Sequence, residues 1–370
     1  MRAPLRSAAL AIVAILVISC GGTGAAPSSA KPLTPITFAF VGSAVDPLAA
    51  NFTVGLEQGY YAAEGLGPVQ FVALSDFAAQ GVALETGRVQ FAVGAPSFQL
   101  GQAAKQKPVP GVNYFAYTYP FKYAWVVRPD SDIKEVKQLV GKTVGVDDLG
   151  KIAAVMAKAL LPAAGVDPAR VSLTATGGGV AGGIALDKGS IQAMLADDTT
   201  RGQWDVAGIK YRELPHPGEV PLVGTFYIQT TAATLKDRPE LAIGFARAVA
   251  KGSIFAAANL ECAAAIFLKN FPQAAPAGIS SEQAIKNIAT IVSKRAPLWL
   301  PTSIGQTKLG ITAPAQWAAE AKYQNIDNGE ALSKALYTNE YIDQINQFDA
   351  AAVTKEAKSC QPSSIYKGTK

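Results

Sequence analysis

Residues 55–97 read GLEQGYYAAEGLGPVQFVALSDFAAQGVALETGRVQFAVGAPS, and this stretch decides the fold class. After the end of a first helix, its pattern predicts a strand over 69–74, a helix over 77–85 and a strand over 91–93. Pro96 then suits the first position of another helix. Strands that alternate with helices indicate βαβ units and a parallel sheet. Small and polar residues follow each strand, where open α/β sheets bind their ligands.

The rest of the chain continues the same alternation. A strand over 36–41 and a helix over 47–63 are predicted at its start. Later strands are predicted over 112–119, 123–127, 143–146, 171–174 and 224–231, with helices over 151–163, 180–188 and 239–269. Pro120 interrupts two neighbouring strands, and we interpret it as the first crossing between two lobes. The strand over 224–231 would carry the chain back.

Six motifs follow one another in a recognisable order. They are GYYAAEGL at 59–66, ALETGRVQFAV at 83–93, GAPS at 94–97, VVRPDSDIK at 126–134, LVGKTVGV at 139–146 and ALDKGSIQA at 185–193. Together they resemble the nitrate/sulfonate/taurine type of periplasmic binding proteins of ABC transporters, a family that includes thiamine-precursor binders. The family usually has an acid where this chain has Gln90.

The resemblance implies an α/β fold of the type II periplasmic-binding-protein class. Two lobes, each a mostly parallel sheet flanked by helices, would be joined by a hinge. The expected divisions are 36–119 plus 224–345 for the first lobe, 122–222 for the second and 346–370 for a C-terminal tail. Two lobes joined by two crossings form a clamp that can close on a ligand.

The first residues predict export. Arg2 and Arg6 precede an apolar run over 8–18 that is too short for an ordinary membrane span, as in a signal peptide. Cys20 follows Val-Ile-Ser and resembles the lipidated cysteine of a bacterial lipobox; the alternative is a plain signal with a chance cysteine. Residues 1–20 are therefore expected to form a lipoprotein signal peptide that ends at the lipidated Cys20. Residues 21–35 are expected to form a flexible tether. The protein would sit on the outer face of the cell membrane.

Charge and cysteine content limit the kinds of partner and cofactor that the sequence predicts. The net charge is +5, or +3 without Arg2 and Arg6, which is too slight to indicate nucleic acid. A lone His216 and the lack of Cys-x-x-Cys predict no metal and no cofactor. Cys262 and Cys360 could form a disulfide in an oxidising compartment, or remain two separate thiols. A monomer is expected.

The candidate ligand-binding residues follow predicted strands or lie near the hinge. They are Ser43, Ser75, Asp76, Ala95, Ser97, Tyr117, Tyr119, Asp148, Thr176, Gly178, Asp198 and Tyr227. Helix N-termini at such positions offer N–H groups to ligand oxygens. For Ser75, Asp76 and Asp198, helix capping is an equal alternative.

The residue types favour one class of ligand. The nearby cations are Lys151 and Arg201, and five acids outnumber them: Asp76, Asp147, Asp148, Asp197 and Asp198. The excess of carboxylates would repel a small anion. Aromatic residues gather over 114–123, and aromatic faces suit a flat ring or a cation. A heterocycle, such as a thiamine precursor or a flavin, or an amine is therefore preferred over sulfonate, taurine or nitrate.

Enzyme functions find little support in the sequence. GGGVAG at 177–182 fits a dinucleotide-binding pattern, but it lies in mid-chain of an exported protein, where NAD is scarce. His216 stands in a Pro-flanked loop without a catalytic partner. The predicted function is a lipid-anchored solute-binding component of an ABC importer. The alternatives are a ligand-sensing lipoprotein and an exported enzyme.

Overall fold

The first sheet has the strand order β2-β1-β3-β10-β4. Its strands are β1 (Thr34–Val41), β2 (Leu66–Leu74), β3 (Phe91–Gly94), β4 (Val112–Thr118) and β10 (Phe226–Thr230). β1 pairs in parallel with β2 and β3, whereas β10 runs antiparallel between β3 and β4. The computed structural model that shows this describes residues 32–42, 44–119, 122–150, 152–216 and 224–368.

The second sheet repeats this topology with the order β7-β6-β8-β5-β9. Its strands are β5 (Tyr123–Val127), β6 (Thr143–Val146), β7 (Ser172–Ala175), β8 (Ala193–Asp197) and β9 (Arg212–Glu213). β5 is antiparallel to both β8 and β9, whereas β6, β7 and β8 are parallel. In each sheet the antiparallel strand comes directly after a crossing from the other sheet. The predicted two-lobed α/β fold is confirmed.

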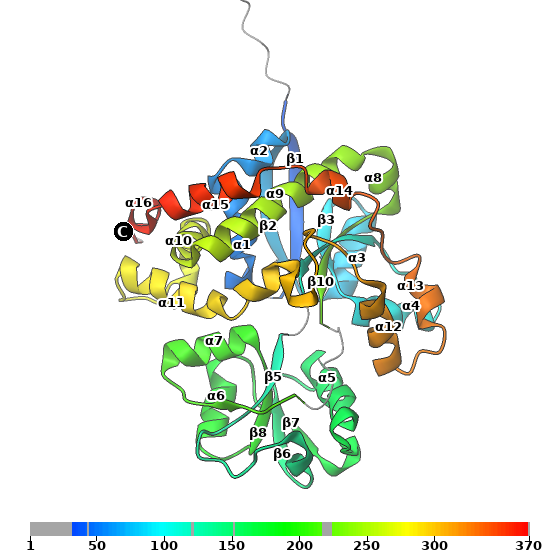
Figure 1. The fold of residues 1–370 in the computed structure, drawn as a ribbon, viewed down its shortest axis with the longest axis vertical. Helices are drawn as coiled ribbons and strands as arrows, with labels where there is room; N and C mark the ends of the chain where they lie inside the picture. Colours follow the sequence, from blue (N-terminus) through cyan, green and yellow to red (C-terminus); the bar gives the residue numbers. More distant parts are fainter. Residues whose placement is uncertain (1–31, 43, 120–121, 151, 217–223, 369–370) are drawn as a thin grey trace, which may run out of the picture. The chain divides into compact units, whose positions relative to one another are not determined.

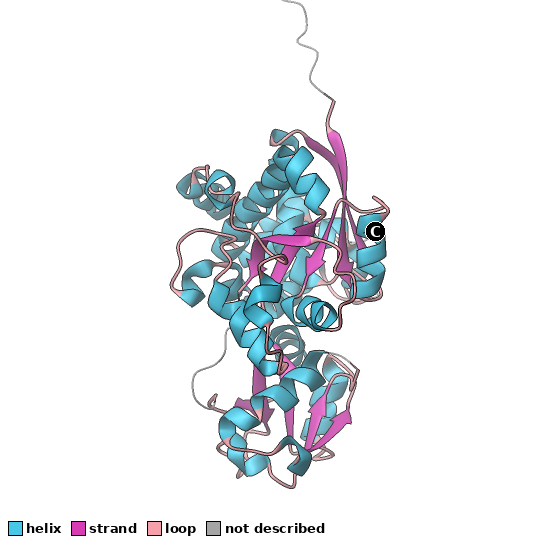
Figure 2. Cartoon of the chain, turned by 90° about the vertical axis from the view of Figure 1, so that its right-hand side faces the viewer, coloured by secondary structure: helices cyan, strands magenta, loops and turns pink. Residues whose placement is uncertain are grey.

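Helices cover both faces of each sheet (Figures 1 and 2). The first lobe carries α1 (Ala50–Glu57), α2 (Tyr60–Ala63), α3 (Phe77–Glu85), α4 (Pro96–Ala104), α8 (Ala232–Asp237), α9 (Pro239–Ala258), α10 (Leu260–Asn270), α11 (Ser281–Ser293), α12 (Pro314–Tyr323), α13 (Gly329–Ser333), α14 (Ile342–Ile345), α15 (Ala350–Ser359) and α16 (Pro362–Ile365). The second lobe carries α5 (Ile152–Leu160), α6 (Val180–Asp187) and α7 (Asp198–Ala207).

The alternation of side chains along each strand fills two cores per sheet. In β1, Phe38 points to the core shared with α1 and α9, while Ala39 packs against α3. In β5, Trp125 packs towards α5, while Val126 faces α6 and α7. Both central strands are therefore buried on two faces, which is why their sequences read as apolar runs.

Two predicted helices are broken, and local residues explain each break. The helix predicted over 47–63 is a short 3-10 turn, η1 (Pro47–Ala49), followed by α1 and α2; Gly59 separates these with φ of 70°. The helix predicted over 239–269 is α9 and α10. Asn259 ends the first of these and caps the second, because its side chain accepts a hydrogen bond from the Cys262 N–H.

Among the described helices, α9 alone is long and apolar enough to span a membrane by length and composition. However, 67% of its most apolar window is buried inside the protein. Its apolar residues pack against the first sheet together with α1. This burial is that of a core helix.

The C-terminal residues are ordered helices that pack on the first lobe. α15 lies along α9, and α16 lies on α10 (Figure 1). A disulfide joins Cys262 in α10 to Cys360 just after α15, with 6.2 Å between their Cα atoms. The segment predicted as a tail thus belongs to the first lobe. At the other end, β1 begins at Thr34, inside the predicted tether.

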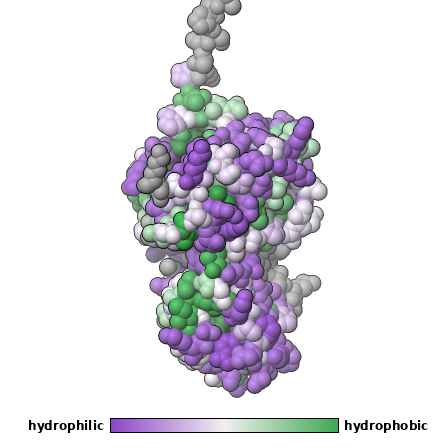
Figure 3. Space-filling view, turned by 90° about the vertical axis from the view of Figure 1, so that its left-hand side faces the viewer, coloured by the Kyte–Doolittle hydropathy of each residue, from purple (hydrophilic) through white to green (hydrophobic). Residues whose placement is uncertain are grey.

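Apolar side chains are exposed on two neighbouring helices of the second lobe. Val180 and Ile184 on α6 and Val206 on α7 are 40%, 44% and 37% exposed. Figure 3 shows green, apolar surface on this lobe. Neighbouring apolar side chains at the surface are typical of a contact with another protein.

Candidate functional site

A buried ion pair joins the two lobes. Asp198 is the first residue of α7, and Arg295 lies between α11 and the 3-10 turn η6 (Ala296–Trp299). The Nη2 of Arg295 donates to Oδ1 of Asp198 at 2.7 Å, and its Nε donates to Oδ2. Their side chains are 1% and 0% exposed. Burial alone would raise the pKa of Asp198, but the charge and hydrogen bonds of Arg295 hold it below its usual value.

Close helix packing surrounds this pair. A Cβ added to Gly202 of α7 would lie 2.7 Å from the backbone of Ile291 in α11, so only glycine allows this approach. Next to it, Lys294 forms an ion pair with Asp205 at 3.1 Å. The two lobes therefore meet through α7 and α11 as well as through the chain crossings.

Asp46 follows β1 on the first lobe and lies near the same ion pair. Its Oδ1 accepts a hydrogen bond from the Leu48 N–H and caps η1. Water reaches the side chain, but the surrounding protein dehydrates it enough to raise its pKa to about 6, and the charges of Asp197 and Asp198 add to this. No Lys, Arg or His in the described part of the chain forms an ion pair with Asp46.

Aromatic rings lie beside these charges. Tyr117 on β4 is 5% exposed, and its ring stacks on Phe226 with 6.3 Å between centroids. Burial raises its pKa, with a lowering effect from Arg295 and a raising one from Asp46. Its hydroxyl makes no hydrogen bond to another described residue. Tyr117 was a predicted site residue and remains a candidate.

Lys122 completes the group, directly before β5. Its side chain is 5% exposed, and its Nζ lies 3.7 Å from the centroid of the Phe226 ring. Its carbonyl accepts a hydrogen bond from Arg201. We call the following residues the junction cluster: Asp46, Tyr117, Lys122, Asp197, Asp198, Phe226 and Arg295.

The structure gives several predicted site residues other tasks. Tyr119 and Tyr227 are both fully buried in one core with Trp317. The Tyr119 hydroxyl accepts a hydrogen bond from the Gly310 N–H at 2.7 Å, and the Tyr227 hydroxyl donates to Gln316 at 3.0 Å. The structure does not support ring stacking on a ligand by these two tyrosines, because core packing covers them.

Three further candidates perform capping or ion pairing. Asp76 caps α3 by accepting from the Ala79 N–H at 2.8 Å, and the Ser75 hydroxyl donates to Asp76 at 2.9 Å. Both are exposed. Asp198 is occupied by Arg295. For these residues the structure favours the capping and pairing alternative over ligand contact.

The remaining candidates lie at strand ends. Ala95 is buried at the start of α4, and the Ser97 hydroxyl donates to Glu320 of α12 at 2.7 Å. Asp148 and Gly178 are exposed, and Thr176 donates to the carbonyl of Val146 at 3.1 Å. None of these five belongs to the junction cluster. Ser43 and Cys20 lie outside the described residues.

The sequence interpretation missed Asp46, Lys122, Phe226 and Arg295. Asp46 and Lys122 lie within three residues of predicted candidates, Ser43 and Tyr119, so a wider search around the strand ends could have found them. Arg295 gave no such signal, because no predicted candidate residue lies near it in the sequence. Lys122 and Arg295 also change the charge balance, because the sequence prediction set five acids against two cations.

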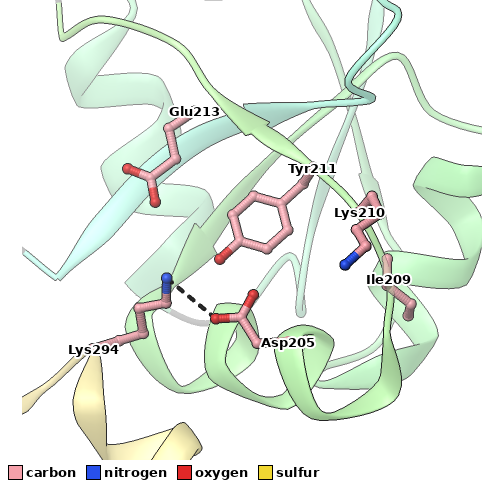
Figure 4. Close-up of a pocket in the computed structure, with 6 residues that line it drawn as sticks. All are labelled: Asp205, Ile209, Lys210, Tyr211, Glu213 and Lys294. Atoms are coloured by element: carbon pink, nitrogen blue, oxygen red, sulfur yellow. Dashed lines mark ion pairs between the residues drawn. The ribbon is translucent and has the colours of Figure 1, made fainter.

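A hollow of about 460 Å³ lies near α7 and β9, lined by Asp205, Ile209, Lys210, Tyr211, Glu213 and Lys294 (Figure 4). Three of its four charged side chains are already in ion pairs: Lys294 with Asp205, and Glu213 with Arg201. Within the described residues, no three His, Cys, Asp or Glu side chains gather to hold a metal ion.

Comparison with known proteins gives one family and a set of structural neighbours. Residues 46–263 match the family described as NMT1/THI5 like. No curated protein matches the chain. The periplasmic aliphatic sulphonate binding protein SsuA of Escherichia coli aligns with TM-score 0.54 and 14% identity, over 84% of this chain and 91% of that one.

Two further structures align over similar lengths. The periplasmic nitrate-binding protein NrtA of Synechocystis PCC 6803 has TM-score 0.56 and 13% identity, covering 89% of this chain and 99% of its own. The periplasmic sulfonate-binding protein SsuA of Methylobacillus flagellatus KT has TM-score 0.55 and 15% identity, covering 89% and 96%. At these identities the likeness shows a shared fold.

Proposed function

Because the chain belongs to the NMT1/THI5-like family, we propose that it is the solute-binding component of an ABC importer. In this role it captures a small organic molecule between its lobes and delivers it to a permease. The exposed apolar residues of α6 and α7 offer a surface for that partner. Lipidation of Cys20, proposed from the lipobox-like sequence, keeps the protein at the outer face of the membrane.

The observation that carries the ligand class is the carboxylate of Asp46. It has no ion-pair partner among the described residues and lies near Arg295, Tyr117 and Asp198. A carboxylate beside aromatic rings suits a ligand that presents N–H donors from a ring or an amine. We therefore propose a heterocycle, such as a thiamine precursor or a flavin, or an amine.

A second candidate is a sulfonate or nitrate. The names of the structural neighbours favour it, and so do the cations Lys122 and Arg295 at the junction. The charge of Arg295 is already paired with Asp198, however, so Lys122 is the single cation of the junction cluster that lacks an ion pair among the described residues. The heterocycle or amine is therefore preferred.

Replacing Asp46 with Asn is expected to raise the Kd of the bound amine or heterocycle at least tenfold. The reason is that a hydrogen bond to a charged group contributes about 1.5–3 kcal/mol. Ligands are first found by thermal shift with aminopyrimidines, flavins, arylalkylamines, sulfonates and nitrate, since a tight ligand raises the apparent stability. Their Kd values are then measured by calorimetry in both proteins.

Asp167→Asn is the matched control for this experiment. Asp167 also precedes a proline and caps a 3-10 turn through the N–H two residues on, and it too is exposed, but it lies away from the junction cluster. It should leave Kd unchanged. The proposed ligand class would be abandoned if only sulfonates or nitrate shift the melting temperature, or if both asparagine variants bind like the wild type.

Binding of a cationic probe should weaken in acid. The Asp46 carboxyl has a pKa raised to about 6, so below this pH it becomes neutral and loses its attraction for a cation. For benzylamine, we expect Kd to rise about tenfold for each pH unit below 6, because one proton must be displaced. The same titration with Asp46→Asn should be flat, and a wild-type curve that is flat from pH 7 to pH 4.5 would contradict this assignment.

A further inference from the structure

Lys122 is a buried cation that forms no ion pair with another described residue. Its Nζ lies 3.7 Å from the centroid of the Phe226 ring and 5.3 Å from that of Tyr123, and the residue is 5% exposed. No carboxylate of a described residue lies within 4.0 Å of it, and it donates no hydrogen bond to one. Attraction to aromatic faces offsets only part of the cost of burying an ammonium group.

The nearest charges explain why Lys122 stays unpaired. Asp198 is held by the Nε and Nη2 of Arg295, and the carboxyl of Glu320 accepts hydrogen bonds from the Ser97 hydroxyl and the Gly224 N–H. Burial and the charge of Arg295 lower the pKa of Lys122 to about 8, although Asp197, Asp198 and Asp46 oppose this. The amine is thus held mostly protonated at neutral pH, although no carboxylate of a described residue is close enough to form an ion pair with it.

The charged groups of the junction cluster that form no ion pair with a described residue include both carboxylates and a cation. Asp46 and Asp197 are carboxylates without ion-pair partners among the described residues, and Asp197 uses one oxygen to cap α7 through the Thr200 N–H. Lys122 is the complementary cation. The Tyr117 ring, which is close enough to Asp46 to feel its charge, stacks on Phe226, and Lys122 lies over the Phe226 ring.

We infer that the ligand is amphoteric: an aromatic or heteroaromatic molecule with an N–H cation for Asp46 and an acidic group, a carboxylate or sulfonate, for Lys122. This inference rests on the proposed function and adds the acidic group to it. A ligand that carries both groups would pair with both Asp46 and Lys122, whereas a plain amine would leave Lys122 without an ion pair. A plain sulfonate would leave Asp46 without a partner.

Two sets of matched probes test this inference. One is benzylamine, benzoate and 4-(aminomethyl)benzoate; the other is tryptamine, indole-3-acetate and tryptophan. In the wild-type protein, the molecule with both groups should bind at least tenfold more tightly than its amine parent in at least one set. Calorimetry and thermal shift measure the two affinities independently.

Lys122→Met is the decisive variant, because Met keeps an unbranched chain over Phe226 and removes the charge. It should abolish the tenfold gain, which is measured as the ratio of the two affinities within each set. Lys251→Met is its control: Lys251 also lies over aromatic rings, 5.6 Å from Tyr60 and 5.8 Å from Phe348, on α9. That control should keep the full gain.

Each outcome decides something different. If the acidic group adds nothing in either set, or if its gain survives in Lys122→Met, the amphoteric ligand is overturned while the importer function stands. If benzoate or indole-3-acetate binds through Lys122 and the amine adds nothing, the ligand is a simple acid and the inference is again overturned. If no probe, heterocycle, sulfonate or nitrate shifts the melting temperature, the proposed function itself fails.

Discussion

Replacing Arg295 with Met is expected to lower the free energy of unfolding by about 3–5 kcal/mol. The substitution leaves Asp198 without its counterion at a position that is 0% exposed. Desolvation of that carboxylate is then uncompensated, and its pKa should rise from below to above the usual value. Urea unfolding followed by tryptophan fluorescence measures the loss.

The neighbouring ion pair provides the control. Lys294 and Asp205 are 34% and 32% exposed, so Lys294→Met should cost about 1 kcal/mol or less. A second variant separates charge from packing: adding Asp198→Asn to Arg295→Met removes the uncompensated charge and should recover a large part of the loss. Equal effects of Arg295→Met and Lys294→Met would show that the buried pair does not stabilise the fold.

This pair also bears on how the lobes move. Asp198 starts a helix of the second lobe, and Arg295 follows a helix of the first, so separating the lobes would break the bond and expose both groups to water. Ligand capture by closure requires such an equilibrium, with a ligand that favours the closed state. Because the charges of Arg295 and Asp198 are paired in a buried place, breaking this pair would cost free energy, and the pair therefore favours the closed state.

The order of strands and helices could be predicted because each element depends mainly on residues that are neighbours in the sequence. Apolar runs such as β3, which the small residue Ala95 follows, mark strands buried on both faces, and Pro96 marks the start of α4. The two helix breaks were not predicted. Gly59 and Asn259 are residue types that often end helices, but the apolar pattern continues on either side of each and favoured one long helix.

The site could be predicted only in part, because its members come from distant segments. Tyr117 lies on a strand that the sequence placed near the hinge, whereas Tyr119, two residues on, turns into another core. Successive odd residues share a face only while the strand continues, and β4 ends at Thr118. Arg295 reaches Asp198 across 97 residues, and no local pattern encodes that contact.

Removing the disulfide is expected to have the second large effect. The bond between Cys262 and Cys360 closes a loop with a sequence separation of 98 residues. In the chain-entropy model, a loop of this length stabilises the folded state by about 4–5 kcal/mol, because it restricts the unfolded chain. The double variant Cys262→Ser and Cys360→Ser should lose stability of this size in urea, and dithiothreitol should lower the wild-type protein to the same value.

Dithiothreitol should leave the stability of the double variant unchanged, so the double variant is the control for other effects of the reductant. Other contacts keep the C-terminal helices in place: Asn259 donates to the Ala357 carbonyl at 2.9 Å, and the Tyr60 hydroxyl donates to Glu356 at 2.6 Å. The native fold should therefore survive, and ligand affinity should not change, because neither cysteine belongs to the junction cluster. A wild-type protein that loses no more stability on reduction than the double variant would show that the bond does not restrict the unfolded chain.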